Sequence, residues 1–286
     1  MLPKPERFAQ ESSVTIAIGL LASDGIVLAA DREEGDLYQK IDQGKIRARY
    51  QDAAPYNTMM VGGAGSGAYA DAFSEEVLQW FSKTHPFDTE SIETALRTLN
   101  KTFYKEHVIP LGTYPAQERP DYALLAVCKT SEGSGLWTSD HLVLNRKYPY
   151  AAIGSGALTA RALLNELYAY VPVISAINLA VYVIGEVKRF VPGCGLDTDV
   201  LFASADSPPV KIVGDDVREI EDALRVFNKL LRRADFHHHI GSDLSQDPRT
   251  KPDKVARGKE RILNQFEQIN QTTITRLASR KSGQGQ

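Results

Sequence analysis

Three short clusters in the sequence contain residue types that can carry out chemistry. Ser139, Asp140 and His141 are the residue types of a hydrolytic triad, but neighbours on a strand point to opposite faces and cannot form a relay. His237–His239 suggest a metal site, yet consecutive histidines rarely reach one ion and no paired His or Cys spacing supports them. The glycine-rich segment 62–67 lacks the Gly-Lys-Ser/Thr ending of a phosphate loop, which favours a tight bend between a strand and a helix.

A fourth possibility lies in the run VTIAIGLLASDGIVLAAD, residues 14–31. In its first part, Val14, Ile16, Ile18 and Leu20 form one large apolar face, whereas Thr15 shares the other face of the strand with alanine and glycine. A Ser-Asp-Gly turn follows, and the second apolar stretch stops at Asp31, which predicts a hairpin. The small-residue face leaves room for a reactive site at the start of the strand. Alternatively, Thr15 is an ordinary strand residue, and Asp31 forms a solvated ion pair with Lys45.

The remaining pattern groups strands and helices in blocks rather than alternating them. A strand from residue 58 enters the glycine-rich bend, and helices are expected over residues 68–83 and 91–108, the second capped by Ser91. Further strands are expected over 121–129, 135–140, 142–147, 150–154, 198–204 and 210–213, and further helices over 157–170 and 173–190. This order predicts an α+β protein in which helix pairs enclose antiparallel sheets, rather than a doubly wound parallel sheet.

The character of the chain changes near residue 216. Residues 1–14 are polar, residues 15–215 carry the strands and helices above, and residues 216–286 predict a helical, polar and partly disordered C-terminal extension. The extension is locally basic, which is the usual composition of a solvated helix face.

Composition excludes several classes of protein. The chain has 286 residues, is 43% hydrophobic and has a formal net charge of -3, which favours a globular protein and does not favour binding to nucleic acid or anionic membranes. Cys128 and Cys194 have no metal-ligand spacing, so reduced thiols are expected. The polar N-terminus does not resemble a secretory signal, and no stretch reaches membrane-spanning length, so a cytoplasmic location is expected.

Four separated segments together resemble a known family. TIAIGLLASDGIVLAAD (15–31), GKI (44–46), GGAGSGAYADA (62–72) and AIGSGALTARALL (152–164) look like segments of the proteasome beta-subunit and its bacterial relative HslV, in one consistent order. These proteins are N-terminal nucleophile hydrolases. The resemblance spans roughly residues 15–213 and implies a four-layer αββα sandwich, followed here by the C-terminal extension.

The resemblance also implies roles for particular residues. Thr15 takes the position of the nucleophile, whose base is the α-amine of the same residue, so residues 1–14 would be a propeptide that is removed. Asp31 takes the position of an acid that orients Lys45, and the lysine charge would stabilise the Thr15 alkoxide. A backbone N–H at Gly67 would help to bind the oxyanion. Ser155 matches a serine near the terminal amine, although it can also cap the helix that begins at residue 157.

Three departures from the family pattern bear on activity. Val14 stands where self-processing members have glycine, and a second aspartate and a companion serine of the family fall on Val191 and Cys194. The loop between Asp31 and Lys45 is about two residues shorter than in typical members of the family.

The resemblance leads to a functional hypothesis. It implies a threonine-type peptidase subunit that hydrolyses polypeptides inside a homo-oligomeric ring or double ring, without metal or cofactor, and that an ATP-dependent unfoldase can supply. The alternatives are a catalytically inactive structural subunit of the same fold, which the departures favour, and a small-molecule amidohydrolase of the same superfamily.

Overall fold

The computed structural model describes residues 15–35, 40–51, 56–86, 88–112, 120–204 and 207–225. The chain divides into two compact units, Met1–Val213 and Gly214–Gln286. In the second unit, residues 215–225 form a helix. The proposed propeptide 1–14 and the residues beyond 225, His237–His239 among them, lie outside the described residues.

The first unit is an α+β structure built on two five-stranded antiparallel sheets. The first sheet has the strand order β10-β1-β2-β11-β12. Its strands are β1 (Ala17–Leu21), β2 (Gly25–Asp31), β10 (Tyr150–Ile153), β11 (Thr198–Ser204) and β12 (Val210–Ile212). Strands β1 and β2 form the expected hairpin, with Ala17 opposite Ala30 and Leu21 opposite Ile26.

The second sheet has the strand order β5-β6-β7-β8-β9. Its strands are β5 (Ile46–Tyr50), β6 (Thr58–Gly65), β7 (Tyr122–Thr130), β8 (Gly133–Asp140) and β9 (Val143–Arg146). A separate two-stranded ribbon, β3 (Glu33–Gly35) with β4 (Lys40–Asp42), lies in the sequence between β2 and β5. The ribbon therefore connects the two sheets through the segment that carries Lys45.

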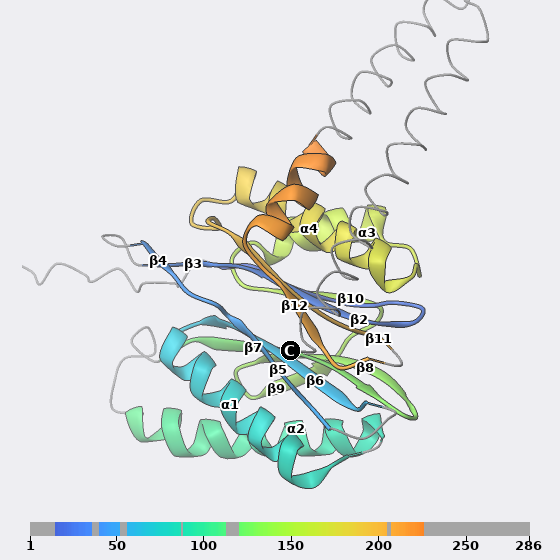
Figure 1. The fold of residues 1–286 in the computed structure, drawn as a ribbon. Helices are drawn as coiled ribbons and strands as arrows, with labels where there is room; N and C mark the ends of the chain where they lie inside the picture. The colour runs from blue at the N-terminus through green and yellow to red at the C-terminus, as the bar shows by residue number, and fades with distance from the viewer. Residues whose placement is uncertain are drawn as a thin grey trace, which may run out of the picture. The chain divides into compact units, whose positions relative to one another are not determined.

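Two helix pairs cover the sheets (Figure 1). Helices α1 (Gly67–Thr84) and α2 (Thr89–Phe103) contact the second sheet, and α3 (Ala157–Leu167) and α4 (Val173–Phe190) contact the first. Short π and 3₁₀ turns, η1 (Tyr104–Val108) and η2 (Ile109–Leu111), follow α2. In the described part of the chain, no helix combines the length and apolar character needed to cross a membrane.

Helix α2 begins earlier and ends earlier than the sequence predicted. Asp88, not Ser91, occupies its N-cap: the Asp88 carboxylate accepts hydrogen bonds from the Ser91 main-chain N–H and hydroxyl, both at 2.6 Å. Both hydrogen bonds lower the pKa of the Asp88 carboxyl, and the bond from the Ser91 hydroxyl has the larger effect. The expectation for Ser91 was wrong because aspartate is an equally good cap and lies three residues before it. At Phe103 the α-helix passes into η1.

The small residues on one face of β1 allow the two sheets to approach each other. Ala17 belongs to a buried cluster that includes residues of both sheets, among them Met60 and Val127. At Gly19, an added Cβ would lie 2.8 Å from Leu136 Cδ1 and 2.8 Å from Val127 Cγ2, both on the second sheet. Contacts this short would force the sheets apart. The alanine and glycine on this face of β1 are therefore required by the packing of the two sheets, and not only by the space that a site at Thr15 would need.

Candidate active site

Thr15, Asp31 and Lys45 form one buried hydrogen-bonded group. Thr15 Oγ1 donates to Asp31 Oδ1 at 2.9 Å, and Lys45 Nζ donates to Thr15 Oγ1 at 2.5 Å and to Asp31 Oδ1 at 2.8 Å. The three residues are 1%, 0% and 9% exposed, respectively. They come from the residues just before β1, the end of β2 and the residue just before β5, so both sheets contribute to the group.

The Asp31 carboxylate is held by the main chain as well as by Lys45. Ile16 N donates to Oδ1 at 3.1 Å, and Gly195 N donates to Oδ2 at 3.1 Å. A fully buried carboxylate is costly unless a cation and hydrogen-bond donors surround it. Because its partners come from both sides, Asp31 has a fixed orientation toward Thr15 and Lys45.

Lys45 is positioned by a main-chain acceptor and by a neighbouring ionic network. Its Nζ also donates to the Glu33 carbonyl oxygen. In the segment before it, Gln43 N donates to the Arg32 carbonyl at 3.0 Å. The Arg32 side chain pairs with Asp42 at 2.5 Å and with buried Asp199 at 3.1 Å.

The same network also affects the protonation of Arg32. Hydrogen bonds to Asp42 and then to Asp199 raise the pKa of Arg32, so this guanidinium stays charged. The network connects β11 to the ribbon and thereby restrains the segment that delivers Lys45.

Ser155 lies in the turn between β10 and α3 and contacts the Thr15 main chain twice. Thr15 N donates to Ser155 Oγ at 3.2 Å, and Ser155 Oγ donates to the Thr15 carbonyl at 3.2 Å. Gly156, not Ser155, is the N-cap of α3, and no side-chain capping bond is present there. The helix-cap interpretation of Ser155 was therefore wrong.

Gly154 allows this turn to approach Thr15. It has a φ of +92°, and a Cβ at this position would lie 2.3 Å from the Thr15 carbonyl oxygen. A residue with a side chain would be both strained and sterically blocked here. The glycine in the Gly-Ser-Gly motif thus brings Ser155 within hydrogen-bond distance of residue 15.

Cys194 and Val191, where the resemblance placed polar partners, do not supply charge. Cys194 Sγ is 3.8 Å from Ser155 Oγ, and burial, followed by the nearby Asp31 carboxylate, raises the pKa of this thiol to about 11. Val191 is the C-cap of α4, and its carbonyl accepts a hydrogen bond from Cys194 N at 3.2 Å. At neutral pH this side of Ser155 therefore presents a neutral thiol.

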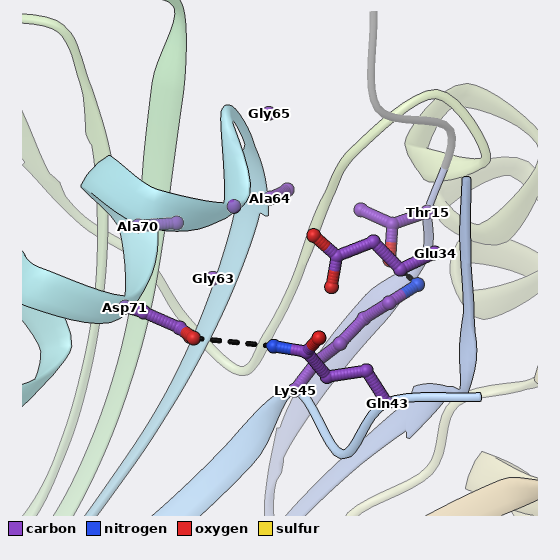
Figure 2. Close-up of a pocket in the computed structure, with 10 residues that line it drawn as sticks. Thr15, Glu34, Gln43, Lys45, Gly63, Ala64, Gly65, Ala70 and Asp71 are labelled. Carbon is purple, nitrogen blue, oxygen red and sulfur yellow. Dashed lines mark hydrogen bonds between the residues drawn. The ribbon is translucent and has the colours of Figure 1, made fainter. Parts of the chain in front are cut away.

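A pocket lies beside Thr15, between the glycine-rich bend and the segment that bears Lys45 (Figure 2). It is open to solvent, and Gly67, the first residue of α1, lines it together with Thr15. Three polar residues of its lining, Glu34, Gln43 and Asp71, were not predicted from the sequence. Glu34 and Gln43 lie in a polar stretch that resembles a solvated loop, so composition alone gave no signal.

Another missed carboxylate is Glu33, which is 6% exposed. A Cβ at Gly195 would lie 2.0 Å from Glu33 Oε2. Gly195, whose main-chain N–H binds Asp31, therefore leaves room for the Glu33 carboxylate because it has no side chain. Glu33 therefore contributes its carbonyl to Lys45 and its side chain to the packing behind the site.

The residues of the discarded triad are separated, as strand alternation predicts. Ser139 is buried, and its Oγ accepts a hydrogen bond from Leu124 N at 3.0 Å. The side chains of Asp140 and His141 are 81% and 53% exposed. They do not form a relay with Ser139.

The fold has known counterparts among solved structures. One is Anbu (ancestral beta-subunit) from Yersinia bercovieri, with a TM-score of 0.58 and 16% identity, covering 83% of this chain and 99% of that one. Another is the Anbu (Gly-1) mutant from Hyphomicrobium sp. strain MC1, with a TM-score of 0.61 and 14% identity, covering 77% of this chain and 96% of that one. No family model matches the chain, and no curated protein sequence matches it.

These comparisons correct the family resemblance. The assignment to the proteasome beta-subunit and HslV family was wrong: the two solved structures described above are Anbu proteins, and no family model supports the assignment. The quoted segments encode the β1–β2 hairpin, the bend before α1 and the turn before α3, which are features of the fold and do not distinguish families that share it. At 14 to 16% identity, the chain shares the Anbu fold.

Proposed function

We propose that this protein is a proteasome-like threonine peptidase subunit in which Thr15 is the nucleophile after removal of residues 1–14. The observation that carries the proposal is the contact of Thr15 Oγ1 with both Lys45 Nζ, at 2.5 Å, and Asp31 Oδ1, at 2.9 Å. A hydroxyl between a buried cation and a carboxylate is suited to losing its proton during attack. The proposal includes the αββα arrangement of the N-terminal nucleophile hydrolases for the first unit.

The proposed reaction is amide hydrolysis through an acyl-enzyme ester. Thr15 Oγ1 attacks the substrate carbonyl carbon while its proton passes to the Thr15 α-amine, which titrates near neutral pH. The Lys45 charge stabilises the oxygen as it loses the proton. Main-chain N–H groups at the start of α1, with Gly67 the first helical residue, would bind the oxyanion.

The remaining steps release the amine product and then hydrolyse the ester. The tetrahedral intermediate collapses with cleavage of the C–N bond, and the departing amine takes the proton from the Thr15 α-amine. Water then adds to the ester carbonyl and gives up a proton to the same amine, and the acid product leaves as Thr15 Oγ1 recovers its proton. Ser155 would orient the amine, since its Oγ already accepts the hydrogen bond from Thr15 N.

We further propose assembly into a homo-oligomeric ring or double ring that an ATP-dependent unfoldase can supply with polypeptide. Exposed apolar side chains on the helix pair of the first sheet favour a protein contact there: Leu158 of α3 is 76% exposed and Phe190 of α4 is 63% exposed. Native mass spectrometry would measure the number of subunits. A monomer at micromolar concentration would contradict the ring.

A second candidate function is an inactive subunit that keeps the fold. Two observations favour it: Val191 and Cys194 supply no charged group near Ser155, and the segment before Thr15 ends in valine instead of glycine. In that case the α-amine of Thr15 would never be released, and the buried group would serve only to join the sheets.

Intact mass and covalent labelling test the proposed function. We expect purified protein to contain a chain that begins at Thr15, and a peptide vinyl sulfone with an uncharged side chain to add once, to Thr15 Oγ1. Thr15→Ala should abolish the adduct, and Thr15→Ser should retain it. A chain that keeps residues 1–14 in every preparation, with no adduct, would contradict the enzyme and favour the inactive subunit.

A further inference from the structure

We infer that Glu34 selects substrates with a cationic side chain, lysine or arginine, at the position that enters the pocket beside Thr15. The inference rests on the proposed function, because it assigns a substrate class to the same site. Three ionisable side chains line the pocket: Glu34, Lys45 and Asp71.

Two of these three charges are already matched within the protein. Lys45 Nζ is 2.8 Å from the Asp31 carboxylate. Asp71 pairs with Arg47 Nη2 at 3.0 Å and accepts a hydrogen bond from Gln43 Nε2 at 3.3 Å. Neither group therefore presents an unmatched charge to a substrate.

Glu34 differs from both. Among the residues that the structure describes, its carboxylate has neither a hydrogen bond nor an ion-pair partner. Figure 2 shows the carboxylate directed toward the bend at Ala64 and Gly65, away from Lys45 Nζ. The pocket consequently contains one unmatched negative charge, which a cation on the substrate would complete. Burial of the pair under bound peptide would strengthen the attraction relative to an exposed ion pair.

The main chain holds Glu34 at this position. A Cβ at Gly67 would lie 2.1 Å from Glu34 Oε1 and 3.2 Å from its Cδ, so the carboxylate rests directly against the first residue of α1. Helix α1 has no acidic residue in its first turn and no side-chain capping bond from Ser66. The Glu34 carboxylate therefore lies at the positive end of this helix.

Small residues form the walls next to Glu34. Gly63, Ala64, Gly65 and Ala70 line the pocket with little or no side-chain bulk. Lysine and arginine have long apolar stems that can lie along such main-chain walls while the charged end reaches the carboxylate.

The decisive experiment compares two fluorogenic peptides that differ only in charge, with lysine or norleucine preceding the scissile bond. For the chain that begins at Thr15, we expect kcat/KM to be about tenfold higher for lysine. Glu34→Gln should bring the ratio close to one, and Glu34→Lys should favour a glutamate peptide. Glu75→Gln, at a partly exposed α1 carboxylate outside the pocket, is the matched control and should keep the wild-type ratio.

The outcomes separate this inference from the proposed function. If both peptides are cleaved with equal kcat/KM, or if Glu34→Gln keeps the preference for lysine, Glu34 does not select the substrate although the protein is a peptidase. If Glu34→Gln changes thermal stability alone, the carboxylate acts only on the N-terminus of α1, and the inference is overturned. If neither peptide is cleaved and the vinyl sulfone does not label Thr15, the proposed function fails, and this inference fails with it.

Discussion

Thr15 Oγ1 and Lys45 Nζ contact the same oxygen, Asp31 Oδ1, at 2.9 and 2.8 Å, and lie 2.5 Å from each other. One carboxylate oxygen thus sets the distance between the proposed nucleophile and its cation. The other oxygen is bound by the main chain at Gly195, so Asp31 cannot turn without losing that hydrogen bond. The geometry of the group depends on two sheets and on the segment after α4.

Replacing Lys45 with methionine should separate chemistry from structure. The change keeps an unbranched side chain that is one atom shorter but removes the charge beside Thr15 Oγ1, and we expect labelling of Thr15 to fall by about 100-fold or more. It also leaves Asp31 buried without a cation, which should cost about 3–5 kcal/mol in the free energy of unfolding. Labelling rates and urea denaturation measure the two effects.

Two further variants control for misfolding. Lys45→Arg keeps the charge and should preserve most of the stability while still slowing the labelling, because guanidinium and ammonium groups donate in different directions. Lys83→Met, at an exposed position in the last turn of α1, should change neither quantity. Wild-type labelling by a folded Lys45→Met protein would show that the lysine has no chemical role.

Replacing Gly154 with alanine should disturb the site through the main chain. Its φ of +92° and the 2.3 Å approach of a Cβ to the Thr15 carbonyl both oppose a side chain, and we expect a loss of about 1–3 kcal/mol in the free energy of unfolding. Labelling of Thr15 should slow as Ser155 moves away from it. Gly185→Ala in α4, where a Cβ has no neighbour within 4 Å, should instead stabilise the protein by about 0.5–1 kcal/mol. Equal effects of the two changes would refute the special requirement at Gly154.

Replacing Gly19 with alanine tests the packing between the sheets. A methyl group there would meet Leu136 and Val127 at 2.8 Å, and overpacking of this kind costs about 1–3 kcal/mol. Thermal denaturation of Gly19→Ala, of Leu136→Val and of the double variant measures the coupling. The double variant should be more stable than the sum of the single changes predicts; strict additivity would mean that Gly19 does not limit the sheet spacing.

The sequence predicted the parts of the structure that depend on local patterns. Alternation and a Ser-Asp-Gly turn predicted the β1–β2 hairpin, and helical periodicity after Pro172 predicted α4 with its observed bounds. Helix α2 was less well predicted, because Asp88 and Ser91 are both good capping residues. Where α2 gives way to η1, the apolar spacing continues and so gave no signal of the change.

The site was only partly predictable for a different reason. Lys45 lies before β5, and its contact with Thr15 depends on the Glu33 carbonyl and the Arg32 network, neither of which any short spacing encodes. Glu33 and Glu34 stand next to each other in a charged stretch, yet one is buried against Gly195 and the other lines the pocket. Such differences arise from long-range packing, which composition does not show.

The thiol of Cys194 should make stability and reactivity depend on alkaline pH. Burial raises its pKa from 9.0 to about 11, so the folded protein keeps the thiol protonated where the unfolded chain begins to lose the proton. A raised folded pKa contributes stability that is fully present below pH 9 and is lost as the pH rises through about 11. Urea midpoints at pH 8 and pH 10.5 should therefore differ more for the wild type than for Cys194→Ser. Iodoacetamide, mapped by peptide mass, should modify Cys194 slowly at pH 8 and faster toward pH 11; rapid alkylation at pH 8 would show that the thiol is not held in its neutral form.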